Sequence, residues 1–193
     1  MEKNIYFVRH GYALHNFLFW KLNREAYDIR DTQLLQEGVE QASELNKKWK
    51  EINDIELVVC SPSIRTLDTA LLVFKGTKHE NKIKALDYLL EYPLGVEECN
   101  RRKDKDVLKT LYKNVSFNDL VNNKLPWNPN KRESVEELEV RHKLLLNWIK
   151  NRPEKNICVV SHSSYISQLL FKNVPDEENE LKHCFPYKYV FKY

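Results

Sequence analysis

The sequence predicts an α/β fold with three layers, in which helices cover both faces of a mostly parallel central sheet. Short apolar runs typical of buried strands occur at residues 5–8, 55–60, 83–90 and 157–160. Stretches with helical periodicity separate these runs along the chain. Strands that alternate with helices build a parallel sheet, and ligands of such sheets bind beyond the carboxyl ends of the strands.

Length and composition fit one domain. The 193 residues can bury a core without disulfides or metal ions, and 42% hydrophobic with 31% charged residues is typical of a globular protein. We expect a single domain over residues 1–193, with an excursion of short helices and loops at about 92–132. No secretory signal and no apolar run of membrane-spanning length occurs, so we expect a cytoplasmic protein without a membrane partner.

Charge and cysteine content narrow the function classes. The 31 basic and 28 acidic residues are mixed along the chain and give a net charge of +3, so we expect no nucleic-acid partner. The four cysteines are far apart and form no CxxC pair, which predicts reduced thiols and no metal site. We expect no cofactor, and the oligomeric state does not follow from the sequence.

The first apolar run, residues 5–8, leads into Arg9, His10 and Gly11. An arginine can bind a phosphate through two N–H groups, a neutral imidazole can attack phosphorus, and a glycine lets the backbone approach an anion. This RHG motif indicates a phosphoryl-handling site, although on these residues alone a charged pair at a strand end is an equal alternative. Residues 17–20 form either a short packing helix or a wall or lid of the substrate pocket.

An amphipathic helix follows. Apolar side chains at steps of three and four predict it over residues 35–52, and Asp31 and Thr32 are its N-cap candidates. Gly38 lowers the helix propensity inside it, so we expect a close approach of another segment there.

In the middle and late parts of the chain, as after residues 5–8, a predicted strand is followed by a charged or catalytic side chain. Residues 55–60 form a strand before a helix that carries Arg65, and residues 83–90 form a strand that ends at Glu91. A further helix is expected to begin at the capping box of Ser134 and Glu137 and to end at Pro153. A strand over 157–160 follows it, and His162 comes before a helix through Leu170. The last expected element is an edge strand over 187–193.

Five side chains at or just beyond predicted strand ends are expected to meet in one crevice: Arg9, His10, Arg65, Glu91 and His162. Each residue alone is compatible with a structural role. Their shared position at the carboxyl edge of the sheet favours a phosphoryl-transfer site.

The motifs also resemble a known family. They are Arg9, His10, Gly11 and Asn16, then Asp31, Leu34, Gly38, Gln41 and Ala42, then Ser61, Pro62, Arg65, Thr69 and Ala70, and finally His162. In this order they resemble the histidine phosphatase superfamily, in its phosphoglycerate-mutase-like branch, over about residues 4–170. The run 90–102 looks most similar to small phosphatase-type members in fungi and plants, and Glu133, Ser134 and Arg141 also match a family pattern.

The resemblance implies a double displacement without a metal. His10 would attack phosphorus and become a phosphohistidine. Arg9, Arg65 and a protonated His162 would surround the phosphoryl oxygens. Glu91 would act as general acid toward the leaving alcohol and then as general base toward water.

Further contacts follow from the resemblance: phosphate contacts from Asn16 and Ser163, and substrate contacts from Tyr92, Arg101 and Arg102. For the two arginines, surface charge is an equal alternative. Glu97 and Glu98 lie close enough in sequence to Glu91 to compete for the acid role. The remaining histidines, His15, His79, His142 and His183, show no metal-like spacing and receive no role.

Three functions are compatible with these residues. The first is a phosphomonoesterase that acts on a small phosphorylated metabolite. The second is a cofactor-dependent phosphoglycerate-type mutase, which would have to keep water from its phosphoenzyme. The third is a non-catalytic phosphate-binding or interaction protein, whose expected mark, loss of a catalytic residue, is not found among the five.

Overall fold

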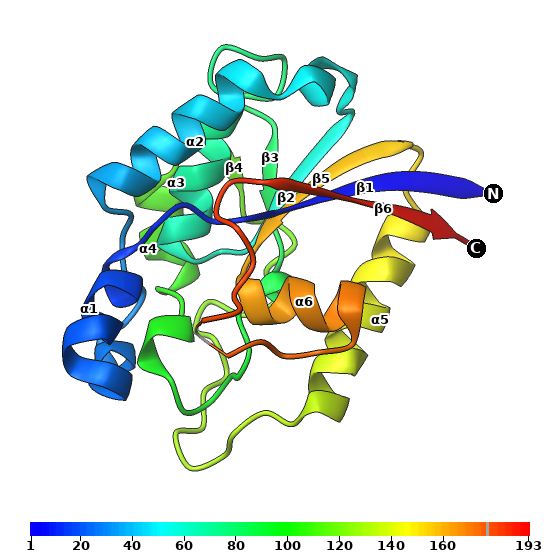
Figure 1. Ribbon diagram of the computed structural model, residues 1–193. Coiled ribbons are helices and arrows are strands. Elements are labelled where there is room, and N and C mark those ends of the chain that lie inside the picture. The colour runs from blue at the N-terminus through cyan, green and yellow to red at the C-terminus, as the bar shows by residue number, and fades with distance from the viewer. Residues whose placement is uncertain (177) are drawn as a thin grey trace.

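A six-stranded sheet forms the centre of the molecule (Figure 1). The computed structural model describes residues 1–176 and 178–193. The strands are β1 (Glu2–Arg9), β2 (Leu57–Cys60), β3 (Ile83–Ala85), β4 (Val115–Ser116), β5 (Asn156–Ser161) and β6 (Pro186–Lys192). Their order is β4-β3-β2-β5-β1-β6, and among these described strands only β6 runs antiparallel to its neighbour. The predicted mostly parallel sheet and the edge strand near the C-terminus are confirmed, and the antiparallel direction of that strand is a finding of the structure.

Helices cover both faces of this sheet, as predicted (Figure 1). The helices are α1 (Leu14–Leu22), α2 (Gln36–Lys48), α3 (Ile64–Val73), α4 (Lys105–Leu111), α5 (Val135–Lys150) and α6 (Ser163–Phe171). Short 3₁₀ helices lie at η1 (Asn23–Asp28), η2 (Lys50–Asp54), η3 (Asp87–Leu89) and η4 (Glu98–Asn100). Side chains of α2, α3 and α4 pack on one face, and side chains of α5 and α6 pack on the other.

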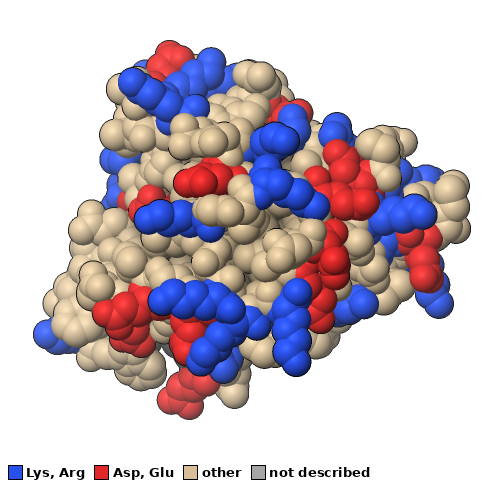
Figure 2. Space-filling model, turned by 90° about the horizontal axis from the view of Figure 1, so that it is seen from above, with Lys and Arg blue, Asp and Glu red and all other residues tan. Residues whose placement is uncertain are grey.

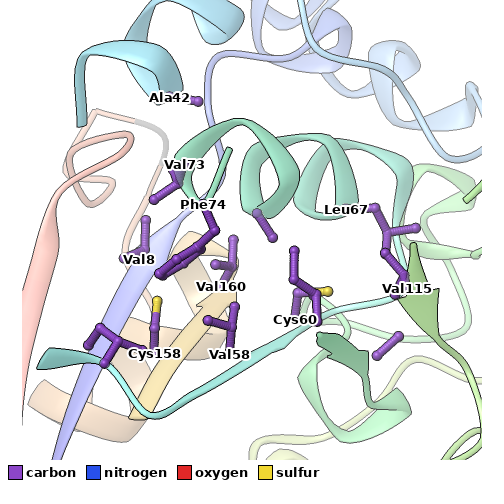
Figure 3. Close-up of a cluster of buried hydrophobic side chains, with 14 of the residues drawn as sticks. Val8, Ala42, Val58, Cys60, Leu67, Val73, Phe74, Val115, Cys158 and Val160 are labelled. Atoms are coloured by element: carbon purple, nitrogen blue, oxygen red, sulfur yellow. The ribbon is translucent and has the colours of Figure 1, made fainter. Parts of the chain in front are cut away.

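Residues 5–8 of β1 are apolar without interruption because both faces of the strand are buried there. Tyr6 and Val8 point into the cluster beneath α3, and Ile5 and Phe7 point into the cluster beneath α5 and α6. Figure 3 shows the first cluster, in which Phe74, the residue that follows α3, lies over valines and cysteines of the central strands. All four cysteines are free and buried.

The register of β1 and β5 brings two sequence motifs side by side. Arg9 pairs with Ser161, so the chain leaves both strands at the same level, and the His10 amide donates to the Ser161 carbonyl at 3.0 Å. The residues after β2 leave the sheet at the same edge, where the Ser61 amide donates to the Val160 carbonyl.

Several predicted boundaries differ from the structure. β1 extends on both sides of residues 5–8, β2 begins at Leu57 rather than at residue 55, and three larger differences follow. The strand expected over 83–90 ends at Ala85, because residues 87–89 turn into a 3₁₀ helix. The helix expected over 35–52 ends at Lys48. Its N-cap is Leu35 rather than Asp31 or Thr32, since the Asp31 carboxylate instead accepts hydrogen bonds from two other segments, at the Ile64 and Lys103 amides.

Gly11 and Gly38 make the close approach that the sequence predicts for α2. A Cβ on Gly11 would lie 2.5 Å from the Gly38 carbonyl oxygen, and a Cβ on Gly38 would lie 2.3 Å from the Tyr12 carbonyl oxygen. Both obstacles are backbone atoms, so α2 can pack against the residues that follow β1 only where both side chains are absent.

The surface mixes both signs of charge. Figure 2 shows lysines and arginines interspersed with aspartates and glutamates on the face seen from above. Across residues 1–176 and 178–193, the helices lack the combination of length and apolarity that crossing a bilayer requires.

Candidate functional site

The carboxyl edge of the sheet brings four nitrogen-bearing side chains together. His10 follows β1, His162 follows β5, and their ring centroids are 5.2 Å apart. Arg65, from the first turn of α3, donates from Nε to His10 Nε2 at 3.3 Å. Arg9 ends β1, and all four side chains are buried.

Hydrogen bonds fix the tautomer of His10. Its Nδ1 donates to the Gly11 carbonyl at 2.7 Å, so Nε2 keeps its lone pair and accepts from Arg65. Burial, together with the positive charge of Arg65, holds the pKa of His10 well below its usual value. The ring is therefore neutral near pH 7, as a nucleophilic imidazole must be.

Arg65 is positioned by the loop that follows Glu91. Its two terminal nitrogens donate to the Cys99 carbonyl at 2.8 Å and to Asn100 Oδ1 at 3.2 Å. The Gly11 amide donates to Thr69, which lies on α3 together with Arg65. The helix α3 therefore carries Arg65 and is also bonded to the residue that follows His10.

Only one ring nitrogen of His162 has a hydrogen-bond partner among the described residues. Its Nε2 lies 2.9 Å from Ser61 Oγ, while Nδ1 is buried without a hydrogen-bond partner among the described residues. Burial and the charge of Arg65 lower its pKa well below the usual value, so His162 is neutral in the free protein. The protonated form that the resemblance implies belongs to the phosphoryl transfer and stays a prediction. An anion at Nδ1 would favour protonation and would satisfy the orphaned nitrogen.

Arg9 is held by the segment that precedes β6. It forms an ion pair with Glu180 and donates from Nη1 to the Leu181 carbonyl at 2.6 Å. Its Nε is buried and has no partner among the described residues. A carboxylate thus occupies part of the guanidinium that the resemblance assigns to phosphate.

Glu91 lies at the N-terminus of α6. Its carboxylate accepts hydrogen bonds from the backbone amides of Ser164 and Tyr165, at 3.2 and 3.0 Å, and from Tyr92 at 2.7 Å. Burial raises the pKa of Glu91, against these hydrogen bonds and the charge of Arg65, which lower it. A carboxyl group that keeps its proton longer than usual suits a general acid.

Glu97 is a second acidic group near this position. Burial raises its pKa to about 7, and the neighbouring charge of Glu91 contributes in the same direction. Asn100 donates to its carboxylate at 3.2 Å, and Arg132 lies 3.9 Å away. Glu98 instead forms an ion pair with Arg101 near the surface, at 3.3 Å.

Asn16 and Ser163 have clear local roles. The Asn16 Oδ1 accepts from the Ala13 amide at the start of α1, which leaves its amide NH₂ to donate elsewhere. The Ser163 hydroxyl accepts from the Leu181 amide at 2.9 Å, and this bond ties the segment before β6 to α6.

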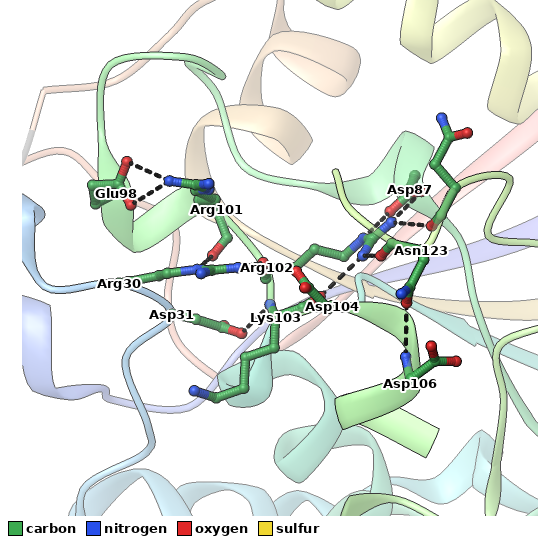
Figure 4. Close-up of polar contacts among 11 residues, drawn as sticks. Arg30, Asp31, Asp87, Glu98, Arg101, Arg102, Lys103, Asp104, Asp106 and Asn123 are labelled. Atoms are coloured by element: carbon green, nitrogen blue, oxygen red, sulfur yellow. Dashed lines mark hydrogen bonds and ion pairs between the residues drawn. The ribbon is translucent and has the colours of Figure 1, made fainter. Parts of the chain in front are cut away.

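Arg102 is not a substrate contact in this structure (Figure 4). It is fully buried, and its guanidinium makes five hydrogen bonds, two to Asp87 and three to the carbonyls of Lys103, Asn122 and Asn123. These bonds use every N–H group, so none is left for a ligand. Both parts of the earlier expectation, a substrate contact or a surface charge, are wrong for this residue.

Arg101 and Tyr92 remain closer to the loop surface. Arg101 pairs with Glu98 and lies over the Trp127 ring, and Arg132 lies over the Tyr92 ring. Tyr92 directly follows Glu91, so it stays a candidate for contact with a leaving group.

Two histidines near His10 had no predicted role. The rings of His15 and His183 each lie 5.7 Å from the His10 ring. His183 Nδ1 donates to the His10 carbonyl at 2.6 Å, and burial lowers its pKa to about 3. No motif marks either residue in the sequence. The burial of His15 becomes visible only in the fold, and His183 is 173 positions from the residue that it contacts. No cluster of three or more His, Cys, Asp or Glu in the described part of the chain is arranged to hold a metal ion.

A groove of about 790 Å³ adjoins this site. Its wall contains Arg9 and Asn16 together with Phe19 and Trp20 of α1, and the segment before β6 forms its other side. Residues 17–20 therefore lie in a helix, which was the first of the two predicted alternatives. Phe19 and Trp20 of this helix also line the groove, which agrees with the second alternative, a wall of the pocket.

Comparison with known sequences identifies the family. Residues 5–184 match the family described as the histidine phosphatase superfamily (branch 1). Phosphoglycerate mutase-like protein 1 of Arabidopsis thaliana is 33% identical over 87% of this chain and 71% of its own length. Another Arabidopsis thaliana protein, named phosphoglycerate mutase-like protein, is 30% identical over 93% of this chain and 78% of its own length.

Solved structures share the fold. A mutant phosphoserine phosphatase from Entamoeba histolytica in complex with phosphoserine has a TM-score of 0.63 and 20% identity, over 98% of this chain and 91% of that one. An ecdysone phosphate phosphatase from Bombyx mori in complex with tungstate has a TM-score of 0.61 and 15% identity, over 98% and 89%. The family match supports the predicted enzyme class, a phosphoric monoester hydrolase. The chain belongs to branch 1 of the histidine phosphatase superfamily.

Proposed function

We propose that the protein hydrolyses the phosphomonoester of a small metabolite through a phosphohistidine at His10. The observation that carries the proposal is the tautomer of His10, whose Nδ1 proton is committed to the Gly11 carbonyl. The lone pair on Nε2, which accepts a hydrogen bond from Arg65, also lies beside His162, and both groups are suited to stabilise a phosphoryl group in transfer.

The reaction proceeds in two displacements. In the first, His10 Nε2 forms a bond to phosphorus, the bond to the leaving oxygen breaks, and Glu91 gives that oxygen its proton. In the second, Glu91 takes a proton from water, whose oxygen forms a bond to phosphorus as the nitrogen–phosphorus bond breaks. Arg9, Arg65 and His162 supply the positive charge, so no step of the proposal needs a metal.

The phosphate position is supported by two orphaned nitrogens. His162 Nδ1 and Arg9 Nε are both buried without partners among the described residues. Buried polar groups are nearly always hydrogen-bonded, and three phosphoryl oxygens would satisfy both. Arg9 would then share its guanidinium between phosphate and Glu180.

A panel of phosphomonoesters, including para-nitrophenyl phosphate, tests the proposal without added metal. Wild type should hydrolyse at least one ester, and His10→Ala should lose at least about 10³-fold in kcat/KM because the covalent route is gone. His79→Gln is the matched control, since His79 is also buried but donates to the Ile55 carbonyl, away from the site. Equal rates for wild type and His10→Ala would rule out the phosphohistidine.

A mutase is the second candidate, because both similar Arabidopsis proteins carry phosphoglycerate mutase-like names. Incubation with a bisphosphoglycerate primer and a monophosphoglycerate separates the two reactions. Release of inorganic phosphate supports the phosphatase, and interconversion of monophosphoglycerates without release supports the mutase. A cytoplasmic location and the lack of nucleic-acid or membrane partners stay predictions.

A further inference from the structure

We infer that His15 is a further residue that contacts the substrate, with its Nε2 binding the phosphoryl group beside His10. The inference rests on the proposed function and adds one contact to its site. The resemblance that located the other site residues gave His15 no role.

The burial of His15 runs against the pattern of its helix. Among the residues of α1, all of which the structure describes, His15 alone is buried, while Phe17 and Trp20 are exposed. Helices ordinarily bury their apolar side chains and leave the polar ones in water. The reversal means that the first turn of α1 places an imidazole, rather than an apolar group, against the site.

The ring of His15 is oriented by one hydrogen bond. Its Nδ1 lies 2.6 Å from Thr32 Oγ1, and Thr32 is itself buried. With Nδ1 engaged, Nε2 is the ring nitrogen left for another partner. When the Thr32 hydroxyl donates to Nδ1, the Nε2 atom carries the proton and can donate to an anion.

The surroundings of His15 are those of the phosphoryl site. Its ring centroid lies 5.7 Å from that of His10. Burial lowers the pKa of His15 well below the usual value, and the charges of Arg65 and Arg9 act in the same direction, so the free protein holds a neutral His15. A neutral N–H donor can stand among these cations without repulsion and still bind a phosphoryl oxygen.

Two variants separate this contact from a structural role. His15→Asn keeps a polar group near Nδ1 for Thr32 but removes the Nε2 donor, whereas His15→Gln places an amide donor near Nε2. We expect His15→Asn to lower kcat/KM by roughly 10- to 100-fold, the loss typical of a hydrogen bond to a charged group, and His15→Gln to stay within about fivefold of wild type. Equal losses in both variants with equally lowered melting temperatures would assign His15 a structural role and overturn the inference.

Binding of inorganic phosphate provides a test that needs no turnover. In the His10→Ala background, calorimetry should show about tenfold weaker binding of orthophosphate after His15→Asn and unchanged binding after His79→Asn. Unchanged affinity in the His15→Asn background would overturn the contact even if an ester is hydrolysed. A wild type that hydrolyses no ester would instead overturn the proposed function, and the calorimetry would still decide the role of His15.

A measurement on the unaltered chain covers the case in which His15→Asn does not fold. In protein with ¹⁵N-labelled histidines, orthophosphate should shift the ring resonance of His15, assigned through His15→Gln, and should leave that of His79 in place. An unmoved His15 resonance at saturating phosphate would overturn the inference.

Discussion

Glu91 combines two opposing electrostatic influences at a single carboxylate. Burial raises its pKa, while three backbone amides and Arg65 stabilise its ionised form. A group that must release a proton and then recover it benefits from such a balance, because neither protonation state is strongly trapped. A bound phosphate dianion would add negative charge nearby and raise the pKa further.

Glu91→Gln should separate esters by their leaving groups. Hydrolysis of an alkyl phosphate should fall by about 10²- to 10⁴-fold, because its alkoxide needs a proton, and the first step with para-nitrophenyl phosphate should change much less. Presteady-state release of the alcohol measures this step. Glu98→Gln is the control, since Glu98 pairs with Arg101 near the surface. Similar losses for both esters would move the acid role to Glu97.

Glu180→Gln should strengthen anion binding. The Glu180 carboxylate pairs with Arg9, so it competes with phosphate for the same guanidinium. Removal of its charge should lower the inhibition constant of orthophosphate several-fold, as expected for one unit charge near a partly screened site. A Glu178→Gln variant is the matched control on the same segment. A raised inhibition constant would show that Glu180 instead positions Arg9 for the ligand.

At the scale of elements, an ion pair connects α5 to the loop that carries Glu91. Arg141 binds both oxygens of Glu133, at 2.6 and 2.8 Å, and donates to the Leu90 carbonyl at 2.6 Å. Glu133 also accepts from the Leu94 amide at 3.0 Å. The ion pair is thus bonded to the chain just before Glu91, at Leu90, and just after it, at Leu94. This gives a physical reason for the match of Glu133 and Arg141 to the family pattern.

Arg141→Met should destabilise the fold by about 3–5 kcal/mol, because it leaves the Glu133 carboxylate buried without its partner. Urea unfolding measures this loss, and the double variant Glu133→Gln/Arg141→Met should recover part of it. Arg152→Met, which breaks a more exposed pair with Glu154, should cost less than about 1 kcal/mol. Equal costs for the two arginine variants would contradict the role of burial.

The elements with strong periodic patterns were predictable from the sequence, and those set by distant contacts were not. The capping box of Ser134 and Glu137 and the buried strand β5 formed as expected. β4 has two residues, too few for a pattern, and depends on pairing with β3. The apolar run after Ala85 reads as continued strand, but the buried Arg102 holds Asp87 where the chain turns.

The site residues also fall into those that the sequence predicts and those that it does not. His10, Arg65 and His162 could be placed together because parallel strands share one carboxyl edge. Glu180 could not be placed, since its contact with Arg9 spans 171 positions and follows no motif.

For the whole molecule, the six histidines make stability depend on pH. Burial lowers the pKa of all six in the folded state, to about 4 for His142 and about 3 for His183. Below the ordinary value of about 6.5, the unfolded chain binds more protons at these sites than the folded one. Stability should therefore fall as the pH drops. Buried carboxyl groups with raised pKa values, such as Glu97 at about 7, act in the opposite direction.

Urea unfolding at pH 7, 6 and 5 measures the free energy of unfolding, and so shows whether the histidines or the buried carboxyl groups dominate its pH dependence. Each histidine contributes up to about 1.4 kcal/mol per pH unit, and the histidines outnumber the acids that oppose them, so we expect the free energy of unfolding to decrease toward pH 5. His142→Gln retains a donor for the Tyr165 carbonyl but cannot titrate, and it should flatten the decrease. A stability that rises toward pH 5 would mean that the buried acids dominate.

The contact between Gly11 and Gly38 has a consequence for how such a sequence can change. In most tight contacts both residues can be substituted during evolution, because a larger side chain at one position is offset by a smaller side chain at the other. Here each added Cβ would meet backbone atoms, and neither glycine has a side chain to give up. Rescue of either substitution would require displacing α2, and with it the buried Leu45. The two positions should therefore stay fixed independently, with no compensating pair of substitutions open to them.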